Sequence, residues 1–144
     1  LYRVRKPYTP EMLDMIDAWM GLDERDWREE TQREVMLALY AIRYPDTLLL
    51  ESFTEKARSD LRRLSAYLHF TNHTYAIWDE DTRRGLAKLG IEIPYTESAD
   101  PFVYGAYVSA IELLKDVAPF TCFIEHDVPR QRLFQAALAA YGRE

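Results

Sequence analysis

Residue pairs that start and stop α-helices divide this sequence, and they limit the folds open to the chain. The Thr-Pro pair at 9–10 and the Asp-Pro pair at 100–101 each place a capping side chain directly before a proline. Gly21 and the Leu-Gly-Ile triplet at 89–91 supply the residue that often ends a helix in the left-handed conformation. Apolar residues recur at three- and four-residue spacing between these signals. The pattern predicts an all-α protein.

Six helical segments follow from this punctuation, at about residues 10–20, 24–44, 46–70, 79–89, 101–117 and 129–141. We expect a single-domain bundle of five or six helices over residues 1–144, with residues 1–8 as an extended basic arm and residues 92–100 as a loop. Residues 35–42 are apolar all round, which favours burial at the centre. In the third segment one apolar stripe contains Leu50, Phe53, Ala57, Leu61, Leu64 and Leu68. In the fifth, we expect Val103, Ala106, Ala110, Leu113, Leu114 and Val117 to face inward, and Gly105, Ala106, Ser109 and Ala110 to let another helix approach closely.

The charge distribution disfavours a general nucleic-acid-binding protein. The net charge is −6, with nine acids against three arginines in residues 9–34 and basic groups concentrated at both ends. An acidic body repels a phosphate backbone unless a basic face is segregated from it. No apolar run approaches the ~18 residues of a membrane-spanning helix, and we expect a cytoplasmic location. The single cysteine, Cys122, excludes an internal disulfide framework and a cysteine-based zinc site.

Three histidines form the candidate metal site. His69 and His73 stand one helical turn apart, and His126 follows far downstream, so the three could bind a divalent ion in a helical bundle. The helical wheel opposes this, because it places His69 and His73 beside Glu51, Glu55 and Arg62 on the expected solvent face. We therefore expect no cofactor and keep a metal-dependent enzyme as one alternative.

Other catalytic arrangements have little support. Cys122 lies in the apolar run at 120–124, which raises a thiol pKa, so we expect an inert buried cysteine. The acids at 23–34 and 79–81 suit helix N-termini, where the dipole favours negative charge. The sequence has no glycine-rich phosphate loop and no nucleophile elbow.

A second alternative uses the N-terminal arm to contact nucleic acid. The arm interleaves aromatic and basic residues, as stacking combined with phosphate contact requires. Its candidate contacts are Tyr2, Arg3, Arg5 and Lys6, which Arg130 and Arg132 could join. The arm is short and the body acidic, so this stays secondary.

The aromatic content favours a protein partner or a homo-oligomer. The chain has ten tyrosines, six phenylalanines and three tryptophans, and tyrosine is enriched in interface hot spots. Four aromatic residues fall off the assigned apolar stripes: Phe70, Tyr95, Tyr104 and Tyr107. The leading hypothesis is a non-enzymatic adaptor, inhibitor or regulatory subunit that binds its partner through acidic helices and these exposed aromatics.

Overall fold

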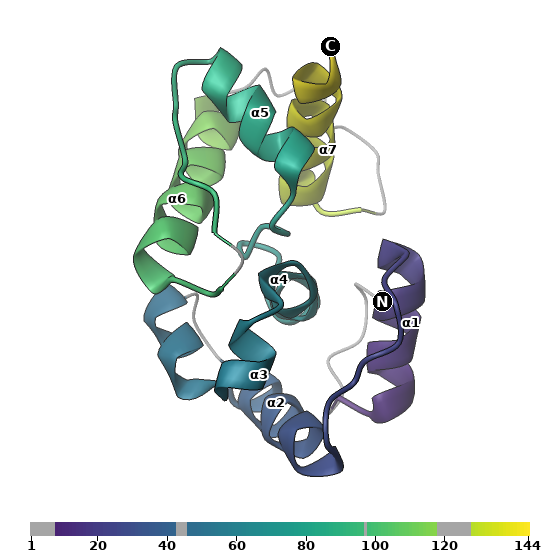
Figure 1. Cartoon of the computed structure of the whole chain (residues 1–144). Helices are drawn as coiled ribbons and strands as arrows, with labels where there is room; N and C mark the ends of the chain where they lie inside the picture. The colour runs from purple at the N-terminus through teal and green to yellow at the C-terminus, as the bar shows by residue number, and fades with distance from the viewer. Residues whose placement is uncertain (1–7, 43–45, 97, 118–127) are drawn as a thin grey trace.

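The computed structural model describes residues 8–42, 46–96, 98–117 and 128–144, and within these ranges the regular structure is entirely helical (Figure 1). The elements are α1 (Pro10–Met20), α2 (Glu29–Ala41), the 3₁₀ helix η1 (Thr47–Ser52), α3 (Glu55–Arg58), α4 (Leu61–Thr71), α5 (Glu80–Lys88), α6 (Pro101–Val117) and α7 (Arg130–Arg143). The all-α prediction is confirmed. No helix in the described ranges is both long and apolar enough to cross a membrane.

Local capping explains the helices whose ends were predicted best. The Thr9 hydroxyl accepts a hydrogen bond from the Met12 backbone N–H at 3.3 Å, which starts α1. Gly21, with φ of 67°, ends it in the left-handed conformation. After α5, the Ile91 N–H donates to the Leu86 carbonyl at 2.9 Å across a left-handed Gly90, which is the predicted helix stop.

The helix predicted over 46–70 is wrong in its continuity, because it divides into η1, α3 and α4. The Thr54 side chain caps α3, and the Asp60 carboxylate accepts from the Arg63 N–H at 3.2 Å to start α4. These caps turn the chain twice, so eight helical elements appear in the described ranges where six were expected. The apolar stripe itself survives, since all six of its members are buried.

The second predicted helix begins later and is less buried than expected. α2 starts at Glu29 instead of residue 24, because the segment before it turns inward: Arg25 reaches a buried charge cluster, and the Asp23 carbonyl accepts from the Arg63 guanidinium. Val35 and Leu39 are buried in α2. Leu37 remains 64% exposed, so the prediction that residues 35–42 are buried all round is wrong.

Helix α4 occupies the middle of the molecule and appears end-on in Figure 1, with α1, α2 and α3 on one side and α5, α6 and α7 on the other. α5 and α7 pack most closely, through Gly85 and Gly142. The close approach predicted for α6 occurs at Gly105, where a Cβ atom would stand 2.9 Å from the Thr47 hydroxyl oxygen of η1, whereas Ala106 and Ser109 are exposed.

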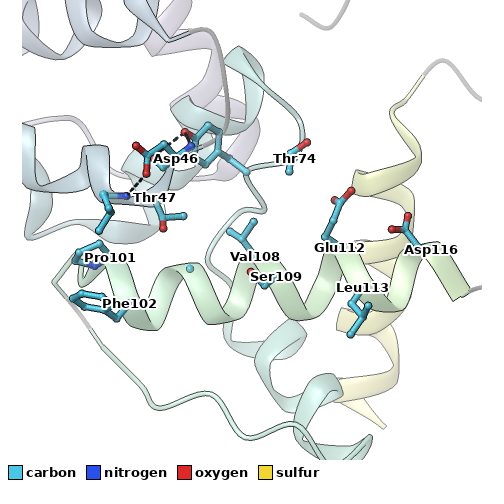
Figure 2. A pocket seen from close by; sticks show the side chains of 13 residues that line it. Asp46, Thr47, Thr74, Pro101, Phe102, Val108, Ser109, Glu112, Leu113 and Asp116 are labelled. Carbon is cyan, nitrogen blue, oxygen red and sulfur yellow. Dashed lines mark hydrogen bonds between the residues drawn. The ribbon is translucent and has the colours of Figure 1, made fainter.

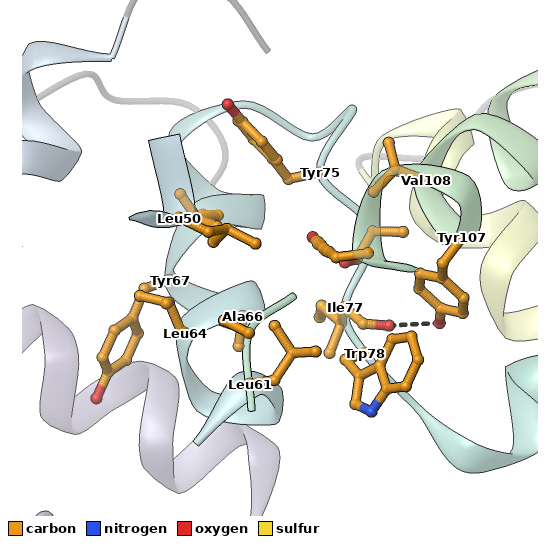
Figure 3. Packing of buried hydrophobic residues seen from close by; sticks show 14 of the residues in the cluster. Leu50, Leu61, Leu64, Ala66, Tyr67, Tyr75, Ile77, Trp78, Tyr107 and Val108 are labelled. Atoms are coloured by element: carbon orange, nitrogen blue, oxygen red, sulfur yellow. Dashed lines mark hydrogen bonds between the residues drawn. The ribbon is translucent and has the colours of Figure 1, made fainter. Parts of the chain in front are cut away.

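The extended segment 75–78 passes through the core, and side chains from the helices satisfy its backbone. Tyr104 donates to the Ala76 carbonyl at 2.5 Å, and Tyr107 donates to the Ile77 carbonyl at 2.7 Å (Figure 3). The Gln135 side chain accepts from the Ile77 N–H at 3.1 Å and donates back to the same residue's carbonyl. Buried backbone groups need such partners when no neighbouring strand supplies them. Several tyrosines of this chain are therefore structural.

Candidate functional site

Tyr104 and Tyr107, two of the predicted partner-binding residues, do not reach the surface. Both are fully buried, and burial raises the pKa of each phenol. Their hydroxyl groups are committed to the backbone of the central segment. Their prediction as exposed aromatics is wrong, because the helix presents them to the segment 75–78 rather than to solvent.

Phe70 and Tyr95, the other two, lie apart from each other. Phe70 is half-buried and makes an edge contact with the Trp19 ring, with ring centroids 5.3 Å apart. Tyr95 is 59% exposed, and the Arg83 guanidinium lies 5.4 Å from its ring centroid. Neither adjoins the larger groove described below.

His69 is buried instead of facing solvent, which corrects its predicted position. It is 1% exposed, and its Nδ1 lies 2.8 Å from the Tyr75 carbonyl oxygen, so Nδ1 carries the proton and donates it. His73 is exposed, and His126 lies outside the described residues. The described ranges contain no group of three histidine, cysteine or carboxylate side chains placed to hold a metal ion.

Burial of His69 makes the fold sensitive to acid. Burial lowers the pKa of His69 to about 4 against the opposing effect of the Tyr75 hydrogen bond, and the positive charge of Arg132 lowers it further. In the unfolded chain the His69 imidazole takes up a proton below its ordinary pKa of about 6.5, whereas in the folded chain it does so only near pH 4. Stability is therefore full above pH 6.5 and falls as the pH is lowered, by about 3 kcal/mol in all.

Urea denaturation between pH 7 and pH 5 measures this effect, because most carboxylates stay ionised in that window. His69→Gln keeps a donor and removes the titration, so we expect its denaturation midpoint to vary much less with pH. If the denaturation midpoint of that variant varied with pH as steeply as that of the unmodified protein, the acid sensitivity could not be assigned to His69.

The structure describes only two of the six residues predicted to contact nucleic acid, Arg130 and Arg132. Tyr2, Arg3, Arg5 and Lys6 lie outside the described residues. Arg132 lies over the Trp19 ring, 5.3 Å from its centroid, and Arg130 is partly buried at the start of α7. This alternative therefore stays a prediction.

α6 turns a second apolar face to solvent, opposite the one that carries Tyr104 and Tyr107. Phe102 is 76% exposed, Leu113 68% and Val117 74%. Ala106 and Ser109 lie between them at helical spacing and are also exposed. The prediction that Ala106, Leu113 and Val117 face inward is wrong, while Val103, Ala110 and Leu114 are half-buried.

A groove runs between this face of α6 and η1, with a volume of about 750 Å³ (Figure 2). We call it the docking groove. Its α6 wall consists of Pro101, Phe102, Gly105, Val108, Ser109, Glu112, Leu113 and Asp116. Its η1 wall consists of Asp46, Thr47 and Leu48, and Thr74 and Tyr75 complete it. Leu48 is itself half exposed.

Local contacts hold the two walls in place. The Tyr75 hydroxyl accepts from the Asp46 N–H at 2.6 Å and donates to the Asp46 carbonyl at 3.1 Å. The Asp46 carboxylate accepts from the Leu48 N–H at 2.9 Å, which starts η1. Because Gly105 has no Cβ, η1 can lie directly against α6. These contacts hold Tyr75 and the η1 wall of the groove in place against α6.

The groove is acidic at the end formed by the last turns of α6. Glu112 and Asp116 both hold the Lys115 ammonium, at 2.8 Å and 3.7 Å. Glu112 Oε2 is buried and has no hydrogen-bond partner among the described residues. With Asp46 on the facing wall, the lining contains three carboxylates. The C-terminal end of a helix dipole adds negative potential at the same end.

A second, polar cavity of about 340 Å³ lies beside α1, but its main groups are already paired. Arg25 Nη1 lies 2.6 Å from Asp17 Oδ2, and the Tyr67 hydroxyl donates to Asp17 Oδ1 at 2.6 Å. Arg25 also donates to the Gln32 side-chain oxygen at 3.0 Å. This cluster ties α1 and the loop before α2 to α4, so we interpret it as structural.

The residues of the docking groove were missed at the sequence level, although one signal was present. α6 is apolar on more sides than one neighbour can cover, and a helix of that kind is either fully buried or meets a partner.

Compared with known protein families, curated proteins and solved structures, the chain has no significant match.

Proposed function

We propose that this chain is a protein-interaction module, an adaptor, inhibitor or regulatory subunit, whose contact surface is the docking groove and whose partner presents a helix. The exposed apolar face of α6 carries the proposal. Large exposed apolar patches rimmed by polar residues mark interaction sites. Covering a side chain such as Phe102 or Leu113 stabilises a complex by about 1.5–3 kcal/mol each.

The shape of the groove supports a helical partner. Phe102 and Leu113 stand about 16 Å apart along the α6 axis, with the small residues Gly105 and Ser109 between them. A helix can approach α6 closely at the small residues while the large ones pack against its sides. This is the helix-in-groove mode of recognition, which reads apolar positions at helical spacing.

A displayed library of randomised 16-residue helical peptides tests the proposal. Peptides selected on the chain are synthesised and their dissociation constants measured by fluorescence anisotropy. We expect Leu113→Ser to weaken their binding at least about tenfold, because it removes an exposed apolar contact worth more than 1.4 kcal/mol. Circular dichroism should show an unchanged fold, since the side chain is exposed.

Leu37→Ser is the matched control, because Leu37 is an exposed leucine of similar exposure on α2, outside the groove. It should leave peptide binding unchanged. Peptides that lose affinity equally for both variants, or a library that returns no binder, would contradict the proposed function.

A further inference from the structure

We infer that the partner helix is basic: it carries lysine or arginine beside its apolar stripe, at the positions that meet Glu112, Asp116 and Asp46. The inference rests on the proposed function and specifies the partner's chemistry. Its first support is charge. Three carboxylates line the docking groove, and Lys115 is paired with two of them, Glu112 and Asp116.

The second support is an unsatisfied acceptor. Glu112 Oε1 accepts a hydrogen bond from the Lys115 ammonium, but within the described part of the chain Glu112 Oε2 has no donor and is shielded from water. Leaving a buried carboxylate oxygen without a hydrogen bond costs free energy. Because the Glu112 side chain as a whole is 35% exposed, turning its carboxylate toward the groove would let a ligand donate to it. Ammonium and guanidinium groups are the side chains that donate most strongly to a carboxylate.

The third support is position along the helix. Glu112 and Asp116 occupy the last turns of α6, where the helix dipole is also negative. A partner helix that runs antiparallel to α6 places its positive N-terminal end there. Basic residues in the N-terminal half of the partner therefore meet the acidic end of the groove, while its apolar residues meet Phe102 and Leu113.

The same charges oppose a second copy of this chain as the occupant. A two-fold symmetric dimer uses the same patch on both protomers. Pairing through the docking groove would bring Asp46, Glu112 and Asp116 of one protomer close to the same acids of its partner. Bringing like charges together in an interface costs binding free energy and so disfavours this dimer.

Two synthetic 16-residue peptides test the inference. Both carry leucine at i, i+4, i+7 and i+11, the spacing of the α6 face, and they differ in having either lysine or glutamate at the flanking positions. We expect the lysine peptide to bind the full chain and the glutamate peptide to bind at least about tenfold more weakly. Binding of the lysine peptide should weaken as salt is raised, because exposed charges are screened.

Neutralising the acids locates the effect. Glu112→Gln combined with Asp116→Asn should weaken the lysine peptide at least about tenfold and flatten the salt dependence. Glu29→Gln combined with Glu30→Gln removes the same charge from the exposed start of α2 and should change binding less than about twofold. Equal losses in the two double variants would overturn the inference, because they would mean attraction to the acidic surface as a whole.

The outcomes separate this inference from the proposed function. Equal binding of both peptides, with both lost in Leu113→Ser, would overturn the basic partner and leave the docking groove in place. No binding of either peptide, together with no selected binder, would remove both proposals. A dimer in size-exclusion chromatography with light scattering that Leu113→Ser dissociates would assign the groove to a second copy instead.

Discussion

Gly142→Ala is expected to destabilise the protein by about 4 kcal/mol or more, enough to unfold a domain of ordinary stability in part. A Cβ atom at this position would stand 1.9 Å from the Asp81 carbonyl oxygen and 2.7 Å from the Gly85 nitrogen. Both are backbone atoms of α5, so no side-chain rotation can relieve the overlap. α5 and α7 would have to move apart, and the packing between them would be lost.

Urea denaturation followed by circular dichroism measures this loss. Gly21→Ala is the control, because a Cβ there meets no atom of the described residues within 4 Å but the backbone is left-handed, with φ of 67°. Its cost is limited to conformational strain of about 1–2 kcal/mol. If Gly142→Ala proved no more harmful than Gly21→Ala, the close packing of α5 on α7 would be refuted.

Asp17→Asn is expected to cost about 3–5 kcal/mol, because it removes the buried carboxylate that Arg25 and Arg63 share and leaves them only the more exposed Asp14 and Asp60. The Asp17 carboxylate lies 2.6 Å from Arg25 and 3.5 Å from Arg63, and all three side chains are almost inaccessible to solvent. The Tyr67 hydroxyl also loses its charged acceptor. A buried pair adds little net stability when intact, but breaking it exposes the full desolvation cost of the remaining charge.

The same denaturation experiment tests this effect. Asp26→Asn is the matched control, because Asp26 holds Lys56 at 2.8 Å on an exposed surface, where water screens the charges. It should leave the denaturation midpoint nearly unchanged. Equal midpoints for the two variants would mean that the Asp17 cluster is hydrated rather than buried.

Helix ends were the part of this fold that local sequence determined best. α1 and α6 have the predicted bounds, and α5 differs by a residue at each end, because their limits depend on capping side chains and glycines within a few residues. The breaks before α3 and α4 use the same chemistry, at Thr54 and Asp60. They were missed because one apolar stripe continues through all three elements, and burial of that stripe does not require an unbroken helix.

The face that α6 buries could not be read from its own sequence. Apolar residues surround this helix, so Leu113 and Val117 compete on hydropathy with Tyr104 and Tyr107 for the inward position. Burial of the extended segment 75–78 decides the competition, because its carbonyl groups need hydrogen-bond donors in the core. A tyrosine hydroxyl can donate and a leucine cannot. The acidic docking groove follows from this choice, since turning the tyrosines inward turns Phe102 and Leu113 outward.

The sequence by itself therefore determined the helical class, several helix ends and the buried stripe of the central helices, because these depend on neighbours along the chain. The tertiary structure alone decided the inward face of α6, the burial of His69 and the position of the groove. Each of these depends on which backbone groups from distant segments remain without a partner once the helices pack.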